Sequence, residues 1–260
     1  MLFSNARLLY TTLVFAILPV VLISELQAYQ PGKWSPMDVY ITEGKKGGPK
    51  RLVLKDSAGK ILEFSDFIYD EDGHLLEEKF YDPSGKYRGK IEYTYALGKI
   101  AQEILKDVDG KLISTKEFNF HNKTMDIVVL DPNGTTIMRH HIIHDNMKVK
   151  GGKEINGKIK DQFSVSYDKQ GRVSLFRFTR EDGTSLSEIY YTYDEMGRLV
   201  SRKLKDDSGE SICKYEYDAS GKLISYTYFN GSEGNWVKDK YLEFFFNGKS
   251  ENERVLSAIN

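Results

Sequence analysis

The chain has 260 residues, of which 40% are hydrophobic and 29% charged, a composition typical of a folded globular protein. Basic and acidic residues nearly balance, 37 against 38, so the formal net charge is −1 and the sequence offers no electrostatic basis for binding nucleic acid. Aromatic residues reach 13%, led by 17 Tyr and 14 Phe, which favours strands over helices. Cys213 is the single cysteine, so an internal disulfide is excluded and a small buried side chain is the expected role.

The N-terminus has the pattern of an export signal. Arg7 precedes an uncharged apolar run over residues 8–23, and a cleavage point follows at Ala28. This order predicts a signal peptide over residues 1–28 and a mature chain that begins near Tyr29. An uncleaved anchor is the alternative, because the run is only slightly shorter than the roughly 20 residues that span a bilayer.

Two polar segments flank the main body of the chain. Residues 29–50 contain three prolines and a Gly-Lys-rich run, which predicts a linker. Residues 249–260 form a polar C-terminal tail. The domain to be explained is therefore 51–248.

This domain is an internal repeat. Turn residues recur every 11 to 14 positions, and nine turns read Asp-x-x-Gly. They begin at Asp56, Asp70, Asp82, Asp107, Asp131, Asp168, Asp194, Asp206 and Asp218. Type I turns favour Asp at the first position and Gly at the fourth, and about eight residues of alternating polarity lie between turns. Each unit therefore predicts one turn and one strand.

Four units share a longer pattern, Tyr-Asp-x-x-Gly-(Arg/Lys/His)-(Leu/Val). They start at Tyr69, Tyr167, Tyr193 and Tyr217. The pattern resembles the YD repeats of Rhs-type proteins and is similar to the short β-repeats of the MORN-variant, YwqK-like family. The resemblance covers roughly residues 52–248 and implies a meandering β-sheet that curls or spirals.

The spacing gives the fold class. Gaps of 11 to 14 residues leave no room for the crossover that parallel strands need, so neighbouring strands must pair antiparallel. About sixteen strands would make a sheet roughly 75 Å wide, and open sheets seldom exceed about ten strands without curling. We predict an all-β protein: a long antiparallel meander of about sixteen short strands, curled or spiralled into one elongated repeat domain.

No catalytic, cofactor-binding or metal-binding residues are predicted. His140 and His144 could share zinc on a helix, but on the strand that the flanking turns favour they lie about 13 Å apart. Acidic turns such as 70–73 and 107–110 each offer two or three of the six or more oxygens that calcium requires. Turn geometry already explains their Asp and Gly.

Aromatic residues crowd the last third of the domain. The candidate binding surface consists of Tyr191, Tyr193, Tyr215, Tyr217, Tyr226 and Tyr228. Two interpretations remain open: packing between strands in the core, or an exposed aromatic surface that binds protein or glycan.

We therefore expect an exported, non-enzymatic bacterial repeat protein that acts as a binding module in the periplasm, at the cell surface or outside the cell. A protein or glycan partner is expected, no nucleic acid, and membrane contact only through the N-terminal segment if it is retained. One alternative is an outer-membrane β-barrel, which about sixteen strands would allow. Short strands and charges on both faces, as at Arg202 and Lys203, count against it. An antitoxin or immunity-like partner is the other alternative, implied only by the YwqK-like similarity.

Overall fold

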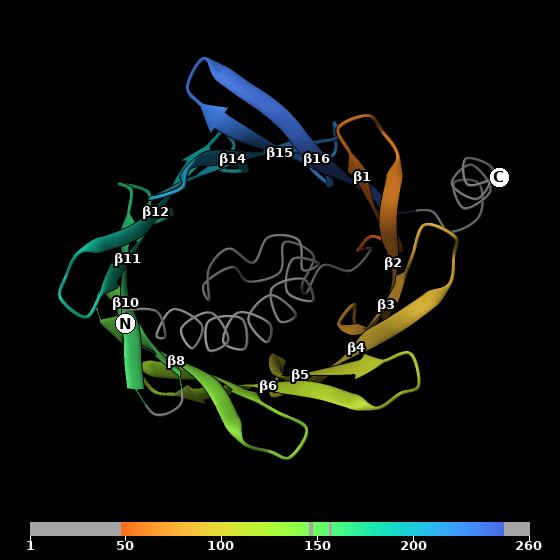
Figure 1. Ribbon diagram of the computed structural model, residues 1–260, viewed down its shortest axis with the longest axis horizontal. Helices are drawn as coiled ribbons and strands as arrows, with labels where there is room; N and C mark the ends of the chain where they lie inside the picture. Colours follow the sequence, from red (N-terminus) through yellow and green to blue (C-terminus); the bar gives the residue numbers. More distant parts are fainter. Residues whose placement is uncertain (1–47, 146–147, 156–157, 247–260) are drawn as a thin grey trace, which may run out of the picture. The chain divides into compact units, whose positions relative to one another are not determined.

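The computed structural model describes residues 48–145, 148–155 and 158–246, and these residues form a single sheet of sixteen antiparallel strands. Every strand pairs with its neighbours in sequence, and the first also pairs with the last, so the sheet closes into a barrel (Figure 1). The strands are β1 (Arg51–Asp56), β2 (Ile61–Tyr69), β3 (Leu75–Tyr81), β4 (Tyr87–Ala96), β5 (Lys99–Asp107), β6 (Leu112–His121), β7 (Thr124–Leu130), β8 (Thr136–Asp145), β9 (Lys148–Ile155), β10 (Lys158–Tyr167), β11 (Val173–Arg180), β12 (Ser185–Tyr193), β13 (Leu199–Asp206), β14 (Gly209–Tyr217), β15 (Leu223–Ser232) and β16 (Asn235–Phe245). The predicted all-β meander of sixteen strands is confirmed.

The predicted curled or spiralled shape is wrong, because the two end strands pair with each other. Six residue pairs join β1 to β16, from Arg51 opposite Phe245 to Asp56 opposite Lys240. Closure satisfies the backbone groups that an open sheet would leave unpaired at its two edges. No short-range pattern in the sequence encodes this pairing, since the strands lie at opposite ends of the domain.

Side chains on the outside of the barrel reinforce this seam. Across the seam, Lys55 of β1 donates a hydrogen bond to Glu243 of β16 at 2.5 Å, and within the adjoining β1–β2 pair Arg51 donates two to Asp66, at 2.6 and 2.9 Å. Between these ion pairs lies a small apolar cluster built on Val53 and Phe64, which are 0% and 3% exposed. Tyr81, Ile61 and Phe245 complete the cluster. The seam is therefore specified by side chains as well as by backbone pairing.

The Asp-x-x-Gly turns form as the sequence predicts at eight of the nine positions. In each of them the glycine N–H bonds the aspartate carbonyl, and the glycine has positive φ, for example 80° at Gly197. A bulge follows where the next strand begins, as between Thr192 and Tyr193 opposite Leu199. The ninth differs, because Asp206 and Gly209 pair directly across a two-residue loop.

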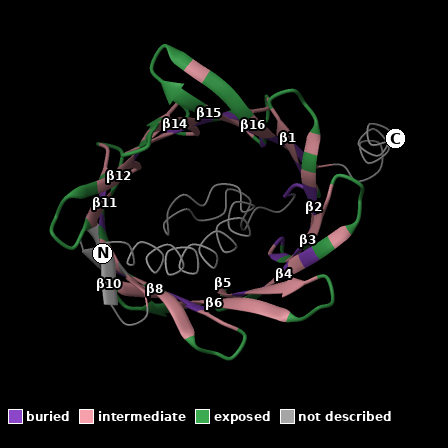
Figure 2. Cartoon of the chain, viewed as in Figure 1, coloured by how far each residue is buried: buried purple, intermediate pink, exposed green. Residues whose placement is uncertain are grey.

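The two faces of the barrel wall differ in polarity. Paired residues share a face, so the register divides the strands into an inner face, which carries Phe67, Tyr93, Phe176 and Tyr226, and an outer face. All buried side chains except Val53, Phe64 and Val128 belong to the inner face. The described residues form a single curved sheet. Side chains on its concave side crowd together, whereas those on its convex side spread apart, so the buried face is the one that faces the barrel axis. Figure 2 shows the turns as mainly exposed, together with the outer part of the β15–β16 hairpin.

Several predictions fall on residues that the structure does not describe. These are the signal peptide at 1–28, the linker up to residue 47, and the tail at 249–260. Within the described ranges there is no helix long and apolar enough to cross a membrane.

Candidate functional site: the tyrosine-lined inner face

The six tyrosines of the predicted binding surface all lie on the inner face. Tyr215 is directly opposite Tyr226, with ring centroids 5.4 Å apart, and Tyr226 also packs against Tyr228 at 5.8 Å. Tyr191 lies opposite Arg202 on the neighbouring strand. Tyr215 and Tyr226 are buried, and Tyr191, Tyr193, Tyr217 and Tyr228 are half-buried. The tyrosines therefore line the inside of the barrel wall along β12, β14 and β15.

The repeat pattern explains why tyrosine stands at the end of a strand. In the turn after β12, the Oδ1 atom of Asp194 accepts the N–H of Arg198 at 2.8 Å, and its Oδ2 atom accepts the Arg198 side chain at 2.7 Å. The Arg198 guanidinium lies 4.9 Å from the ring centroid of Tyr217, at the end of β14. The Tyr217 hydroxyl in turn donates to the carbonyl of Leu199 at 2.9 Å. We call this linked set of aspartate, cation and tyrosine a tyrosine clasp.

Two other clasps repeat this arrangement. Tyr193 donates to the Val173 carbonyl at 2.9 Å beneath the Arg172 guanidinium, and Tyr95 donates to the Leu75 carbonyl at 3.0 Å. In the latter the cation is replaced by His74, whose ring centroid lies 4.7 Å from that of Tyr95. Each clasp joins a turn to the following hairpin. Tyrosine in the YD pattern therefore holds a turn against the neighbouring hairpin, whether or not it also binds a partner.

Three charged side chains that the sequence did not identify as candidate site residues are buried on the inner face. Glu78, Glu103 and Arg202 are 2%, 4% and 1% exposed. Glu78 accepts a hydrogen bond from Tyr93 at 3.2 Å, and Glu103 pairs with Lys116 at 2.6 Å. The Arg202 guanidinium lies 5.5 Å from the ring centroid of Tyr215. Buried charges of both signs thus accompany the aromatic rings, and only the tertiary structure distinguishes them from solvated charges.

The outer face carries ladders of ion pairs instead. Lys90 bonds Glu77 and Glu92, both at 2.7 Å, and Lys106 bonds Glu92 at 2.6 Å. Hydrogen bonds from these lysines hold the pKa of both glutamates below the usual range, so the pairs stay ionised. The outside of the barrel therefore suits contact with water.

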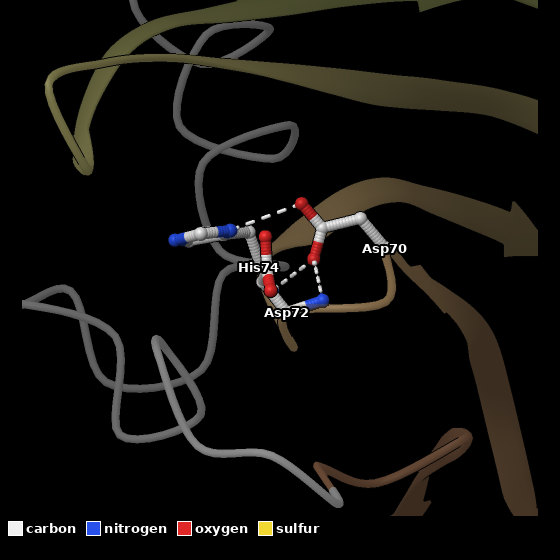
Figure 3. Close-up of side chains that lie close together, drawn as sticks. All are labelled: Asp70, Asp72 and His74. Atoms are coloured by element: carbon white, nitrogen blue, oxygen red, sulfur yellow. Dashed lines mark hydrogen bonds and ion pairs between the residues drawn. The ribbon is translucent and has the colours of Figure 1, made fainter.

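One turn brings together three side chains that could hold a metal ion, Asp70, Asp72 and His74 (Figure 3). Asp70 is already engaged: its Oδ1 accepts the N–H groups of Asp72 and His74, at 3.0 and 2.8 Å, and its Oδ2 lies 3.0 Å from the His74 ring. Burial would raise the pKa of Asp70, but the bonds from His74 lower it. Arg198 occupies the same place as His74 in the clasp of Asp194. The group is therefore explained as a tyrosine clasp with histidine as the cation.

The histidine-rich segment forms a strand, β8, as the turn signals predict. His140 lies opposite Ile127 on the inner face, and His141 lies opposite Asp126 on the outer face, where its ring pairs with that carboxylate at 2.5 Å. Adjacent histidines on a strand point to opposite faces and cannot share an ion. Cys213 is fully buried on the inner face, as expected of a lone strand cysteine.

Comparison with protein families identifies a match over the central and C-terminal part of the barrel. The Teneurin YD-shell family matches residues 102–235, just over half of the chain. The chain belongs to the Teneurin YD-shell family. This match confirms the YD-repeat character predicted from the Tyr-Asp units, whereas the YwqK-like similarity stays a prediction. No curated protein matches the chain.

Solved structures resemble the chain only distantly. A porin-like protein from Bacteroides uniformis is 12% identical, with a TM-score of 0.36, and the match covers 76% of this chain and 98% of that one. A porin-like protein from Bacteroides vulgatus is 10% identical, with a TM-score of 0.44 and the same coverage. The Photorhabdus luminescens Tc holotoxin pore is 13% identical over 70% of this chain and 12% of that one, with a TM-score of 0.18. With TM-scores this low, the structural similarities add nothing to the family assignment.

Proposed function

We propose that this protein is an exported, non-enzymatic binding module that holds its partner against the aromatic inner face of the barrel. The observation that carries the proposal is the division of the wall into two faces. Aromatic and aliphatic side chains line the inside, and ion pairs cover the outside. A barrel of sixteen strands is wider than its own side chains fill, because barrels of this strand number enclose a channel. An apolar lining of such a lumen provides a large surface for a partner of similar chemistry.

A polypeptide is the partner that this lining fits best. Tyrosine is prominent among the residues that dominate the energetics of protein–protein interfaces, and the half-buried Tyr191 and Tyr228 keep part of their surface accessible on this face. A glycan-binding surface would present flat rings to the solvent, whereas Tyr215 and Tyr226 pack against each other.

An outer-membrane β-barrel requires the opposite arrangement of the faces. Such barrels carry an apolar band on the outside and polar side chains inside, and a lysine or arginine facing the lipid at mid-depth costs about 2–4 kcal/mol. Here Lys90 and Lys106 stand on the outer face. The strand number agrees with that alternative, but the polarity of the wall disfavours it.

Two adjacent tyrosines provide a direct test. Tyr191 is on the inner face, opposite Arg202, and Tyr190 is on the outer face, opposite Lys203 and 38% exposed. A photocrosslinking phenylalanine analogue at position 191 should trap a polypeptide in intact cells, and the same analogue at position 190 should not. Mass spectrometry of the adduct distinguishes a polypeptide from a glycan. An adduct from position 190 alone, or from neither position, would refute the proposal.

The exported location is tested separately. Fractionation of the native cells, combined with protease treatment of intact cells, should place the chain in the periplasm, at the surface or in the medium. Recovery from the cytoplasm would contradict export and leave the crosslinking result to be interpreted by itself.

A further inference from the structure

The turn between β4 and β5 presents a leucine in an unfavourable backbone conformation. Ala96 pairs with Lys99, so the loop consists of Leu97 and Gly98. Their φ angles are 52° and 72°, which is the type I′ geometry that glycine, asparagine and aspartate adopt readily. Leu97 is the one residue other than glycine with positive φ in the described part of the chain. A bulky side chain at such a φ is strained.

Packing does not compensate for this strain. Leu97 is 102% exposed, so its side chain makes no stabilising contact with the barrel. Asparagine would relieve the backbone strain and would also suit the exposed position. Leucine at this site therefore lowers stability through its backbone conformation, gains nothing from packing, and leaves a whole apolar side chain available for a contact outside the barrel.

The neighbouring hairpin extends this apolar tip into a small patch. β5 pairs with β6, and Phe120 near the end of β6 is 44% exposed. The Nζ atom of Lys99 lies 4.9 Å from the centroid of the Phe120 ring. Lys123 is exposed in the next turn. The two turns, residues 96–99 and 121–124, contain these two lysines and no carboxylate.

We propose that this rim patch (Leu97, Lys99, Phe120 and Lys123) docks the barrel onto an anionic lipid surface. Leu97 and Phe120 enter the boundary between headgroups and acyl chains, and the two lysines pair with lipid phosphates. A protein interface needs roughly 800 Å² on each partner, far more than two side chains supply, whereas lipids rearrange around a single inserted residue. The two lysines of the patch complement an anionic membrane, and the carboxylates Asp70, Glu71 and Asp72 in the β2–β3 turn of the same rim confine the contact to the sector between the β4–β5 and β6–β7 turns.

Vesicle flotation of the full chain tests the proposal. Binding should be stronger to vesicles that contain phosphatidylglycerol than to phosphatidylcholine alone. Leu97→Asn should reduce partitioning about tenfold or more, as expected when a leucine no longer enters the apolar phase. Lys99→Gln and Lys123→Gln should each reduce it about fivefold, and only on the anionic vesicles.

Val108 provides the matched control. It lies just beyond the opposite end of β5, is 50% exposed, and stands between Asp107 and Asp109. Val108→Asn should leave partitioning unchanged. Leu97→Asn should also raise the thermal midpoint, so that its loss of binding cannot be attributed to unfolding.

A local probe separates this contact from any other lipid-binding segment of the chain. Cys213 is fully buried, so a polarity-sensitive dye will label Leu97→Cys or Val108→Cys selectively. The dye at position 97 should shift to the blue on anionic vesicles, and the dye at position 108 should not. The proposal is overturned if position 97 gives no shift, if both positions shift alike, or if Leu97→Asn partitions like the unmodified chain.

Discussion

Removing one hydroxyl group from a tyrosine clasp should measurably destabilise the whole barrel. Tyr217→Phe deletes the hydrogen bond to the Leu199 carbonyl, which is 2.9 Å long, and keeps the ring under the Arg198 guanidinium. A single intramolecular hydrogen bond contributes about 0.5–1.5 kcal/mol net, and the half-buried carbonyl loses its partner, so we expect a loss of about 1 kcal/mol. For a domain of this size that corresponds to about 2–4 °C in the thermal midpoint.

Tyr190→Phe is the control for this experiment. Its hydroxyl donates to Glu188 on the outer face, where the side chain is 38% exposed. Loss of an exposed hydrogen bond should change the unfolding free energy by less than about 0.5 kcal/mol. Urea unfolding, followed by circular dichroism, compares the two variants with the unmodified protein under identical conditions.

A second clasp tests whether the effect belongs to the repeat. Tyr95 makes the equivalent bond to the Leu75 carbonyl on β4, far from Tyr217 on β14. Well-separated substitutions add, so the double variant Tyr95→Phe with Tyr217→Phe should lose about 2 kcal/mol. If Tyr217→Phe cost no more than Tyr190→Phe, the clasp would not stabilise the fold and the account of the YD pattern given above would be wrong.

Three further predictions concern other parts of the chain. Gly197→Val should cost about 1–3 kcal/mol in urea unfolding, because valine is strained at a φ of 80°, although a Cβ there would meet only Arg172 Nη1, at 3.8 Å. Unchanged stability would contradict this. Burial raises the pKa of Glu63 from 4.5 to about 7, although the positive charges of Lys240 and Arg88 oppose the shift. The folded state therefore holds this proton more tightly than the unfolded state, and the unfolding free energy should fall as the pH rises from 4.5 through 7. Glu63→Gln should flatten that fall, which unfolding midpoints across this pH range would detect. N-terminal sequencing of the exported protein should begin near Tyr29, and retention of Met1 would argue against cleavage.

The candidate site was only partly predictable from the sequence. Period-two alternation places Tyr215 and Tyr217 on one face, and pairing across the hairpin adds Tyr226 and Tyr228. Alternation does not say which face points inward when both carry charges, as Arg202 and its neighbour Lys203 do. The register resolves this, because Arg202 shares its face with the buried Cys213 and Lys203 shares its face with Ile212. Glu78 and Glu103 were missed for the same reason: each reads as one polar residue in an alternating strand.

The sequence by itself determined the turns, because each turn depends on only a few adjacent residues. An aspartate oxygen reaches the backbone N–H groups two and four positions later, and a glycine takes positive φ beside it, so Asp168 and Gly171 define their turn without help from the rest of the chain. Eight turns of this kind, together with the other turn residues, give the number of strands and their antiparallel order. Closure was decided only by the tertiary structure, because it joins Lys55 to Glu243, which are 188 positions apart. The local sequence does not specify the small twist and curvature that each hairpin adds to the sheet. Because these add up over sixteen strands, they determine whether β1 and β16 come close enough to pair.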